Sequence, residues 1–163
     1  MIVYEREVEL KLPPAARPRR RELTRFLREA IDATGLSGDV SVLLTGDEAI
    51  RTLNRNFRGK DKPTDVLSFP AAETAGGVAG DVAISFETAF RQAQEHNHPL
   101  EMEIKLLLLH GLLHLAGYDH EIDNGAMHRK EKRLRRELGL TAALIERAHA
   151  APSQRRAREA VRA

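Results

Sequence analysis

The spacing of apolar residues predicts alternating strands and helices in the first half of the chain. Apolar and charged residues alternate at the N-terminus, as in a strand with one buried face, and prolines then interrupt the pattern. Apolar residues next recur at helical spacing, and two glycines end that segment. Acidic residues open a later short helix, where negative charge is favourable. The predicted elements are strands over 2–12 and 40–44 and helices over 23–31 and 47–57.

Helical patterns dominate the second half of the chain. A polar loop over 58–65 leads into a short apolar segment, and a glycine-rich turn then precedes a strand around Val82 and Ile84. The helices predicted after that strand cover residues 87–96, 100–116, 126–138 and 142–148. These elements predict an α+β (mixed α/β) fold, in which a small sheet of about four strands packs against about five helices.

Length and composition indicate one globular domain, which we expect to span residues 1–150, followed by a basic C-terminal tail over 151–163. The chain has 163 residues, 42% hydrophobic and 31% charged, enough to form a hydrophobic core. Its N-terminus lacks the apolar core of a secretory signal. The most apolar stretch, 104–117, is shorter than the roughly 20 residues that cross a bilayer. We therefore expect a cytoplasmic protein with no membrane partner.

Charge is unevenly distributed along the chain. The formal net charge is only +2, yet residues 128–163 carry eleven Lys and Arg against four Asp and Glu, and a second basic run lies at 17–28. Such asymmetry can steer a protein toward polyanions. Solvated helix faces and a flexible tail would give the same composition, so charge alone does not assign a nucleic-acid partner.

Three histidines stand in a spacing typical of a metal site. The chain has no cysteine, so a transition-metal site must use histidine or carboxylate ligands. His110 and His114 are four residues apart and therefore project from the same face of a helix. Gly117 can end that helix in a left-handed conformation and turn His120 back toward the same point. The spacing predicts a metal centre at the end of the central helix.

Three protein ligands would leave one position of a tetrahedral zinc ion open, as in catalytic sites. Zinc can lower the pKa of bound water to about 7, so this pattern favours hydrolysis. The alternative is that the histidines are buried and hydrogen-bonded without a metal, and a structural metal is a further one. The other histidines, His96, His98, His128 and His149, lack such spacing, and we expect them at the surface.

The same spacing occurs in metzincin proteases, where the residue after the first histidine is the glutamate that acts as general base. Here that residue is Gly111. A glycine cannot accept a proton, so the match supports the metal geometry and argues against ordinary peptide hydrolysis.

The sequence resembles the YbeY family of bacterial endoribonucleases and ribosomal RNA maturation factors. The resemblance spans residues 53–131 and includes Met127 and Glu131 near its end. Its main segments are LNRNFRGKDKPTDVLSF at 53–69, GDVAIS at 80–85 and HGLLHLAGYDH at 110–120. The first 50 residues and the chain after about Leu140 carry little of it.

The resemblance implies a zinc-dependent endoribonuclease specific for single-stranded RNA, acting in maturation of the 3′ end of 16S ribosomal RNA and in ribosome quality control. It implies that His110, His114 and His120 bind Zn²⁺ and that the partner is ribosomal RNA. Ribosomal proteins are further candidate partners. Arg58 falls on the family's characteristic arginine, and its guanidinium could hold a phosphate and stabilise charge developing on phosphorus. A surface arginine without such a role is the alternative.

The sequence is compatible with more than one role for several residues. Asp65, Asp81 and Asp119 are candidate general bases, although Asp119 could instead orient a ligand histidine. Met127 could lie under the metal, as in metzincins, or belong to the core. Competing functions are a zinc hydrolase of another substrate, such as a metzincin-like peptidase, and a ribosome-assembly factor whose metal is structural.

Overall fold

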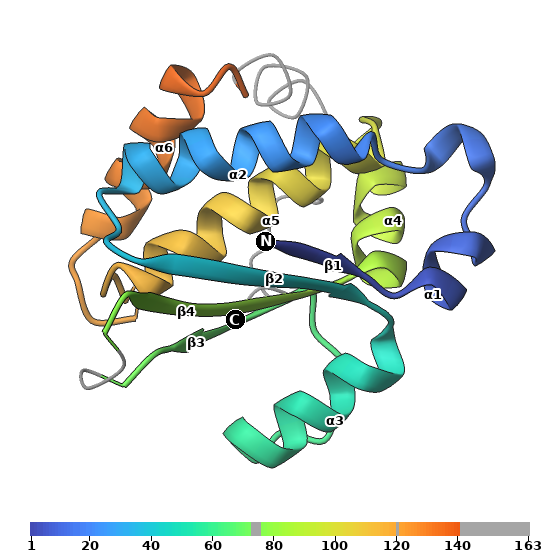
Figure 1. Cartoon of the computed structure of the whole chain (residues 1–163), viewed down its shortest axis with the longest axis horizontal. Coiled ribbons are helices and arrows are strands. Elements are labelled where there is room, and N and C mark those ends of the chain that lie inside the picture. The colour runs from blue at the N-terminus through green and yellow to red at the C-terminus, as the bar shows by residue number, and fades with distance from the viewer. Residues whose placement is uncertain (73–75, 120, 141–163) are drawn as a thin grey trace.

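The computed structural model describes residues 1–72, 76–119 and 121–140, and a four-stranded sheet runs through it (Figure 1). Strands β1, β2 and β4 are parallel, and β3 pairs with β4 in the antiparallel sense at one edge. The sheet order is β1-β2-β4-β3. The strands span Ile2–Tyr4 (β1), Asp39–Thr45 (β2), Val66–Pro70 (β3) and Val78–Ser85 (β4).

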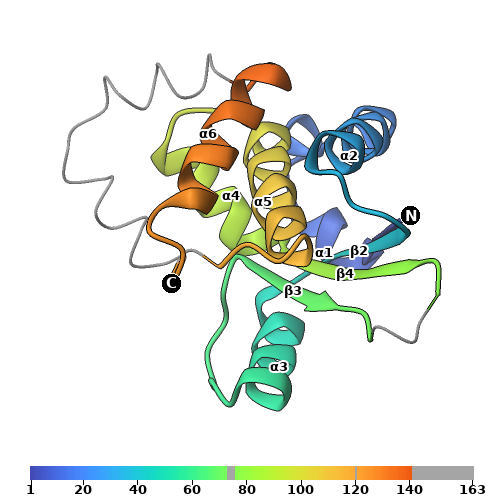
Figure 2. The ribbon, with the colours of Figure 1, turned by 90° about the vertical axis from the view of Figure 1, so that its left-hand side faces the viewer.

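Helices cover the two faces of the sheet unequally. Helices α2, α5 and α6 lie on one side, and α3 lies on the other (Figure 2). The described helices are α1 (Arg6–Lys11), α2 (Arg20–Thr34), α3 (Asp47–Arg58), α4 (Phe86–Glu95), α5 (Leu100–Leu115) and α6 (Ala126–Glu137), with a short 3-10 turn at Pro14–Ala16. The α+β fold class predicted from the sequence is therefore confirmed.

Helix α5 forms the centre of the molecule. It packs on β3 and β4 and against α2, α4 and α6, so it is surrounded on most sides. Leucines on several of its faces are fully buried, as expected for a helix that is apolar all round. Within the described residues, no helix is long and apolar enough to cross a membrane.

The N-terminal strand is shorter than its sequence pattern predicts. The strand predicted over 2–12 ends at Tyr4, and the helix α1 begins at Arg6. Val8 and Leu12 both enter the core. Their separation of four residues fits one face of a helix, and this burial outweighs the alternating pattern.

Three further sequence predictions fall outside the described residues. The helix predicted over 142–148 and the tail over 151–163 lie beyond residue 140. The domain boundary predicted at residue 150 lies there too, so it stays a prediction.

Asp47 fixes the start of α3 to the end of β4 and to α4. One of its carboxylate oxygens accepts hydrogen bonds from the hydroxyls of Ser85 and Thr88, each at 2.6 Å, and the other pairs with Arg91 at 2.9 Å. Partial burial acts to raise the pKa of Asp47, but these hydrogen bonds outweigh it and hold the pKa below its ordinary value. The network sets where α3 leaves the sheet.

Gly80 allows α5 to approach the sheet closely. Its backbone has φ +148°, and a Cβ atom there would overlap the carbonyl oxygen of Phe69 and lie 2.8 Å from a methyl of Leu115. Leu115 is the last residue of α5, one position after His114. The absence of a side chain at Gly80 therefore helps to place the histidine-bearing end of that helix.

We expect Gly80→Ala to destabilise the protein by at least about 2 kcal/mol, because it combines backbone strain with overpacking. Gly76→Ala is the matched control, since nothing lies within 4 Å of a Cβ at Gly76 and its φ is not positive. Urea denaturation of both variants measures the difference. Equal midpoints for the two variants would contradict this account of Gly80.

Candidate metal centre

His110 and His114 occupy the last two turns of α5 and turn their rings toward each other. Their Nε2 atoms are 3.2 Å apart, and the ring centroids are separated by 4.8 Å. His110 is buried and His114 is half-buried. The helical spacing seen in the sequence therefore does bring these two side chains together.

The turn after α5 fixes the ring of His114. Gly117 has φ +95°, and its N–H donates to the carbonyl of His114, as the sequence predicted for a glycine that ends the helix. This turn brings the carbonyl oxygen of Tyr118 to 3.0 Å from Nδ1 of His114. A carbonyl can only accept, so Nδ1 carries the proton.

Glu131 on α6 fixes the ring of His110. Its carboxylate lies 3.4 Å from Nδ1 of His110 and also accepts from Arg135 at 2.7 Å. Sequence reasoning included Glu131 in the family resemblance but gave it no role. The sequence does contain one indication of this role. Glu131 stands between Met127 and Leu134 in the apolar stripe of α6, and a carboxylate in a buried stripe needs a buried polar partner.

These contacts leave the two Nε2 atoms suited to a cation. With Nδ1 of each ring donating to an oxygen, the neutral form of each histidine carries its lone pair on Nε2. Two acceptors at 3.2 Å need a proton or a metal ion between them. Two nitrogens bound to a tetrahedral zinc at about 2.0–2.1 Å would lie roughly 3.3 Å apart. The pair therefore fits zinc in both chemistry and spacing.

The third predicted ligand, His120, lies outside the described residues. Among the residues that are described, no group of three metal-binding side chains gathers. The described part of the site is thus a histidine pair with its two oxygen acceptors, and the full ligand set stays a prediction.

Arg58 lies apart from the histidine pair. It is exposed at the end of α3, and α3 and α5 are on opposite faces of the sheet (Figure 2). Within the described ranges its guanidinium forms no hydrogen bond or ion pair. The loop that follows is tied back to α3, because Arg51 binds Asp61 through two hydrogen bonds and holds the pKa of that carboxyl below its ordinary value.

Most of the chain matches a known protein family. Residues 11–139 match the model of the family described as endoribonuclease YbeY. The chain belongs to the YbeY family. This confirms the resemblance noted in the sequence.

Individual members of this family match the chain over most of its length. The chain is 52% identical over 125 residues to the endoribonuclease YbeY of Koribacter versatilis, which covers 77% of this chain and 81% of that one. It is 41% identical over 157 residues to that of Heliobacterium modesticaldum, with 85% and 95% covered. The solution structure of TM1509 from Thermotoga maritima is 30% identical, with a TM-score of 0.55, and the match covers 93% of this chain and 98% of that one.

The candidate bases of this YbeY-family chain lie in three different places. Asp65 is 1% exposed and accepts from Gln92 and from the backbone of Val66. Asp81 is exposed and lines a pocket on the face of the sheet that carries α3. The carboxylate of Asp119 caps the turn after α5 by accepting from the N–H of Glu121. Within the described residues, the acceptors at Nδ1 of His114 and His110 are the Tyr118 carbonyl and the Glu131 carboxylate, not Asp119.

Met127 belongs to the hydrophobic core, where its side chain is 1% exposed.

Two other histidines differ from their predicted surface positions, because His96 and His98 are buried. Nε2 of His98 lies 2.6 Å from the buried carboxylate of Glu103, and Nδ1 of His96 lies 2.6 Å from a backbone carbonyl. Polar partners inside the fold account for this burial. His128 is exposed as predicted, and His149 lies outside the described residues.

Gly111 explains why this YbeY-family motif lacks the metzincin glutamate. It faces the sheet, where a Cβ would lie 2.9 Å from a methyl of Val82 and 3.1 Å from the hydroxyl of Ser68. That hydroxyl donates to the Gly111 carbonyl at 2.9 Å. The absence of a side chain at Gly111 lets α5 pack closely on the sheet, and the space is too small for a carboxylate side chain.

We expect Gly111→Ala to lower the stability of this YbeY-family protein by about 1–2 kcal/mol. Overpacking against Val82 costs about 1–3 kcal/mol, and the better helix propensity of alanine offsets up to about 1 kcal/mol. Urea denaturation measures the loss. Adding Val82→Ala should make the Gly111→Ala change less destabilising, and additive effects in this double-mutant cycle would show that the two positions do not clash.

Proposed function

We propose that this chain is a zinc-dependent endoribonuclease that cleaves single-stranded RNA. The family model and the relatives that it matches carry the name endoribonuclease. The observation that carries the zinc dependence is the approach of the two Nε2 atoms, 3.2 Å apart, with an acceptor at Nδ1 of each ring. His110, His114 and His120 would hold the ion.

A zinc ion held by these histidines would supply a hydroxide at neutral pH and would polarise a phosphoryl oxygen. The residues of the chain contribute orientation and charge. Tyr118 and Glu131 hold the imidazoles of His114 and His110 in the tautomer that binds a metal. Arg58 binds a phosphate of the RNA strand, since its exposed guanidinium can donate two parallel hydrogen bonds to phosphate oxygens.

The biological substrate follows from the family resemblance. We propose that the enzyme matures the 3′ end of 16S ribosomal RNA and takes part in ribosome quality control, with ribosomal proteins as partners and the cytoplasm as its location. Phosphate contacts would provide most of the affinity, because phosphate neutralisation dominates RNA binding.

A peptidase is the less favoured alternative, because Gly111 replaces the carboxylate that activates water in metzincins and the sheet leaves no space for it. A ribosome-assembly factor with a structural metal is favoured only if the protein binds zinc and RNA but does not cleave. Incubation with single-stranded RNA and with casein, with and without a chelator, separates these functions.

His114→Ala should remove most of the zinc that elemental analysis finds in the purified protein, because it deletes one of the two facing nitrogen ligands. His128→Ala is the matched control, since His128 is exposed on α6 and should leave the zinc content unchanged. A full equivalent of zinc in His114→Ala would refute the assignment.

Arg58→Ala should lower RNA cleavage by at least about tenfold, because the loss of a charge-assisted contact to phosphate costs about 1.5–3 kcal/mol. Its melting temperature and zinc content should not change, since the side chain is exposed. Arg28→Ala, an exposed arginine on α2, removes the same charge elsewhere. Equal cleavage rates for these two variants would rule out the proposed role.

A further inference from the structure

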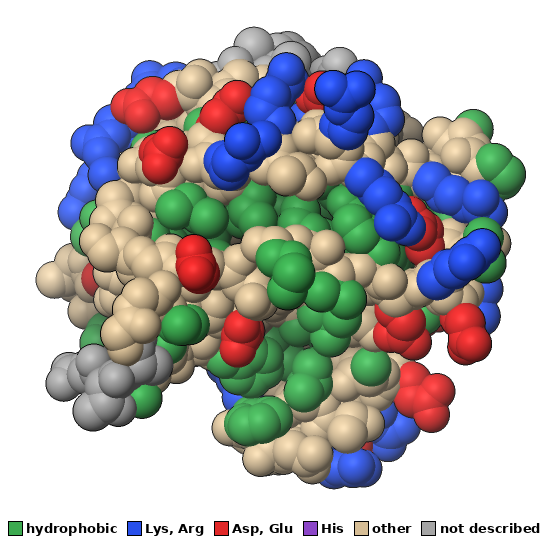
Figure 3. All heavy atoms as spheres, viewed as in Figure 1, with side chains coloured by type: hydrophobic (Ala, Val, Ile, Leu, Met, Phe, Trp, Pro, Cys, Tyr) green, Lys and Arg blue, Asp and Glu red, His purple; other side chains and the backbone are tan. Residues whose placement is uncertain are grey.

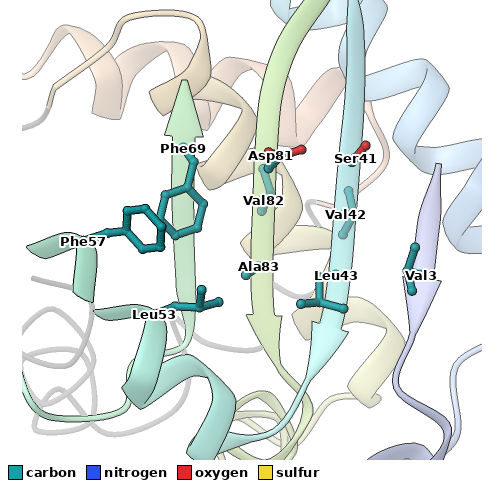
Figure 4. A pocket seen from close by; sticks show the side chains of 10 residues that line it. All are labelled: Val3, Ser41, Val42, Leu43, Leu53, Phe57, Phe69, Asp81, Val82 and Ala83. Carbon is teal, nitrogen blue, oxygen red and sulfur yellow. The ribbon is translucent and has the colours of Figure 1, made fainter. Parts of the chain in front are cut away.

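The face of the sheet that carries α3 contains an open pocket of about 420 Å³. Hydrophobic side chains gather in the hollow between the sheet and α3 (Figure 3). Side chains from three strands and from α3 line it (Figure 4), and they include Ser41, Leu43, Leu53, Phe57, Phe69 and Asp81. The YbeY-family motifs place Phe57, Phe69 and Asp81 here, while the histidine pair lies on the other side of the sheet.

Strand register arranges the pocket in two rows. Phe69 pairs with Asp81, and Asp81 pairs with Ser41, so these residues form one row across three strands. Leu43 belongs to the next row on the same face, which is apolar. The pocket therefore has an apolar floor with a carboxylate and a hydroxyl at one end.

Phe57 forms an exposed aromatic wall. Its side chain is 68% exposed, and its ring meets that of Phe69 edge to face, with centroids 5.2 Å apart. The chain has few aromatic residues, only 4% in all, and most of its phenylalanines are buried or half-buried. An exposed aromatic beside an open pocket offers a surface for stacking.

We propose that this pocket binds one base of single-stranded RNA and prefers guanine. The inference rests on the proposed endoribonuclease function and names a subsite for its substrate. The base would stack on Phe57 and lie over Leu43 and Leu53. The carboxylate of Asp81 would accept hydrogen bonds from the two adjacent donors of guanine, N1–H and the N2 amino group.

The chemistry of the pocket favours guanine over the other purine. Guanine presents two neighbouring donors, which one carboxylate can accept together. Adenine presents an unprotonated N1 at the corresponding position, and that lone pair repels a carboxylate. The volume is within the roughly 300–1,000 Å³ of small-ligand pockets.

Charge near the pocket favours a nucleotide over an isolated base. Arg58 and Lys60 follow Phe57 closely in the chain and are exposed. Cations beside an exposed aromatic ring form the combination that binds single-stranded nucleic acid, because they pair with phosphates while the ring stacks on a base.

Strand β3 connects this pocket to the histidine pair. Neighbouring residues of a strand point to opposite faces, so Phe69 lines the pocket while the hydroxyl of Ser68 donates to the carbonyl of Gly111 at 2.9 Å. Gly111 follows His110 directly. An RNA strand held in the pocket would therefore reach the histidines by passing around the edge strand β3.

The test measures equilibrium binding of fluorescein-labelled ten-nucleotide RNAs to the full-length chain by fluorescence anisotropy, in EDTA so that no RNA is cleaved. The probes are oligouridine with one central guanosine, adenosine or inosine. Phe57→Ala should weaken binding of the guanosine probe about 5- to 100-fold, which corresponds to the loss of the stacking free energy of one base. Phe57→Trp should restore the binding, because tryptophan also offers an aromatic ring for stacking. Leu10→Ala, which truncates an exposed leucine on α1, should change nothing.

Asp81→Asn should reduce the preference for guanosine over adenosine, which we expect to be about fivefold or more in the unmodified protein. Inosine lacks the N2 amino group and should bind with intermediate affinity. Equal binding by Phe57→Ala and the unmodified protein would overturn the proposal and would leave a protein partner as the occupant. Loss of binding in Phe57→Ala without any zinc-dependent cleavage by the unmodified protein would uphold the pocket and refute the endoribonuclease function.

Discussion

The fold depends on the close packing of α5 against strands β3 and β4. Two glycines make it possible, because Gly111 and Gly80 each stand where a Cβ would overlap a neighbour across the interface. Close packing also brings the backbone carbonyl of Gly111 within reach of the Ser68 hydroxyl. This interface fixes the rotation of α5 about its axis, and the rotation decides which way His110 and His114 point.

The same interface explains how a metzincin-like histidine spacing occurs here without the general base. In a helix that exposes the residue after its first histidine, a glutamate could accept a proton from water. In this chain that residue is Gly111, which faces the sheet, and the close packing leaves no space for a side chain at this position. The remaining polar contacts serve the imidazoles instead, through the Tyr118 carbonyl and the Glu131 carboxylate. Helix packing therefore restricts the chemistry that the motif can support.

The two faces of the sheet carry different functional groups. The face under α5 is sealed by apolar packing and carries the histidine pair at its edge, while the face under α3 keeps an open pocket and exposed cations. Asp47 links the two sides, because it ties the first turn of α3 to the end of β4 and to α4. A rigid start for α3 sets the positions of Phe57 and Arg58 three turns later.

The sequence by itself determined the α+β class, the helices from α2 to α6 and the pairing of His110 with His114, because these depend on local spacing along one element. It did not predict α1, because the burial of Val8 and Leu12 depends on core residues from other parts of the chain. Only the tertiary structure decided that Glu131 contacts His110, that Gly111 faces the sheet and that Phe57 borders a pocket. These contacts join residues distant in sequence, and no local periodicity encodes which surfaces meet when the chain packs.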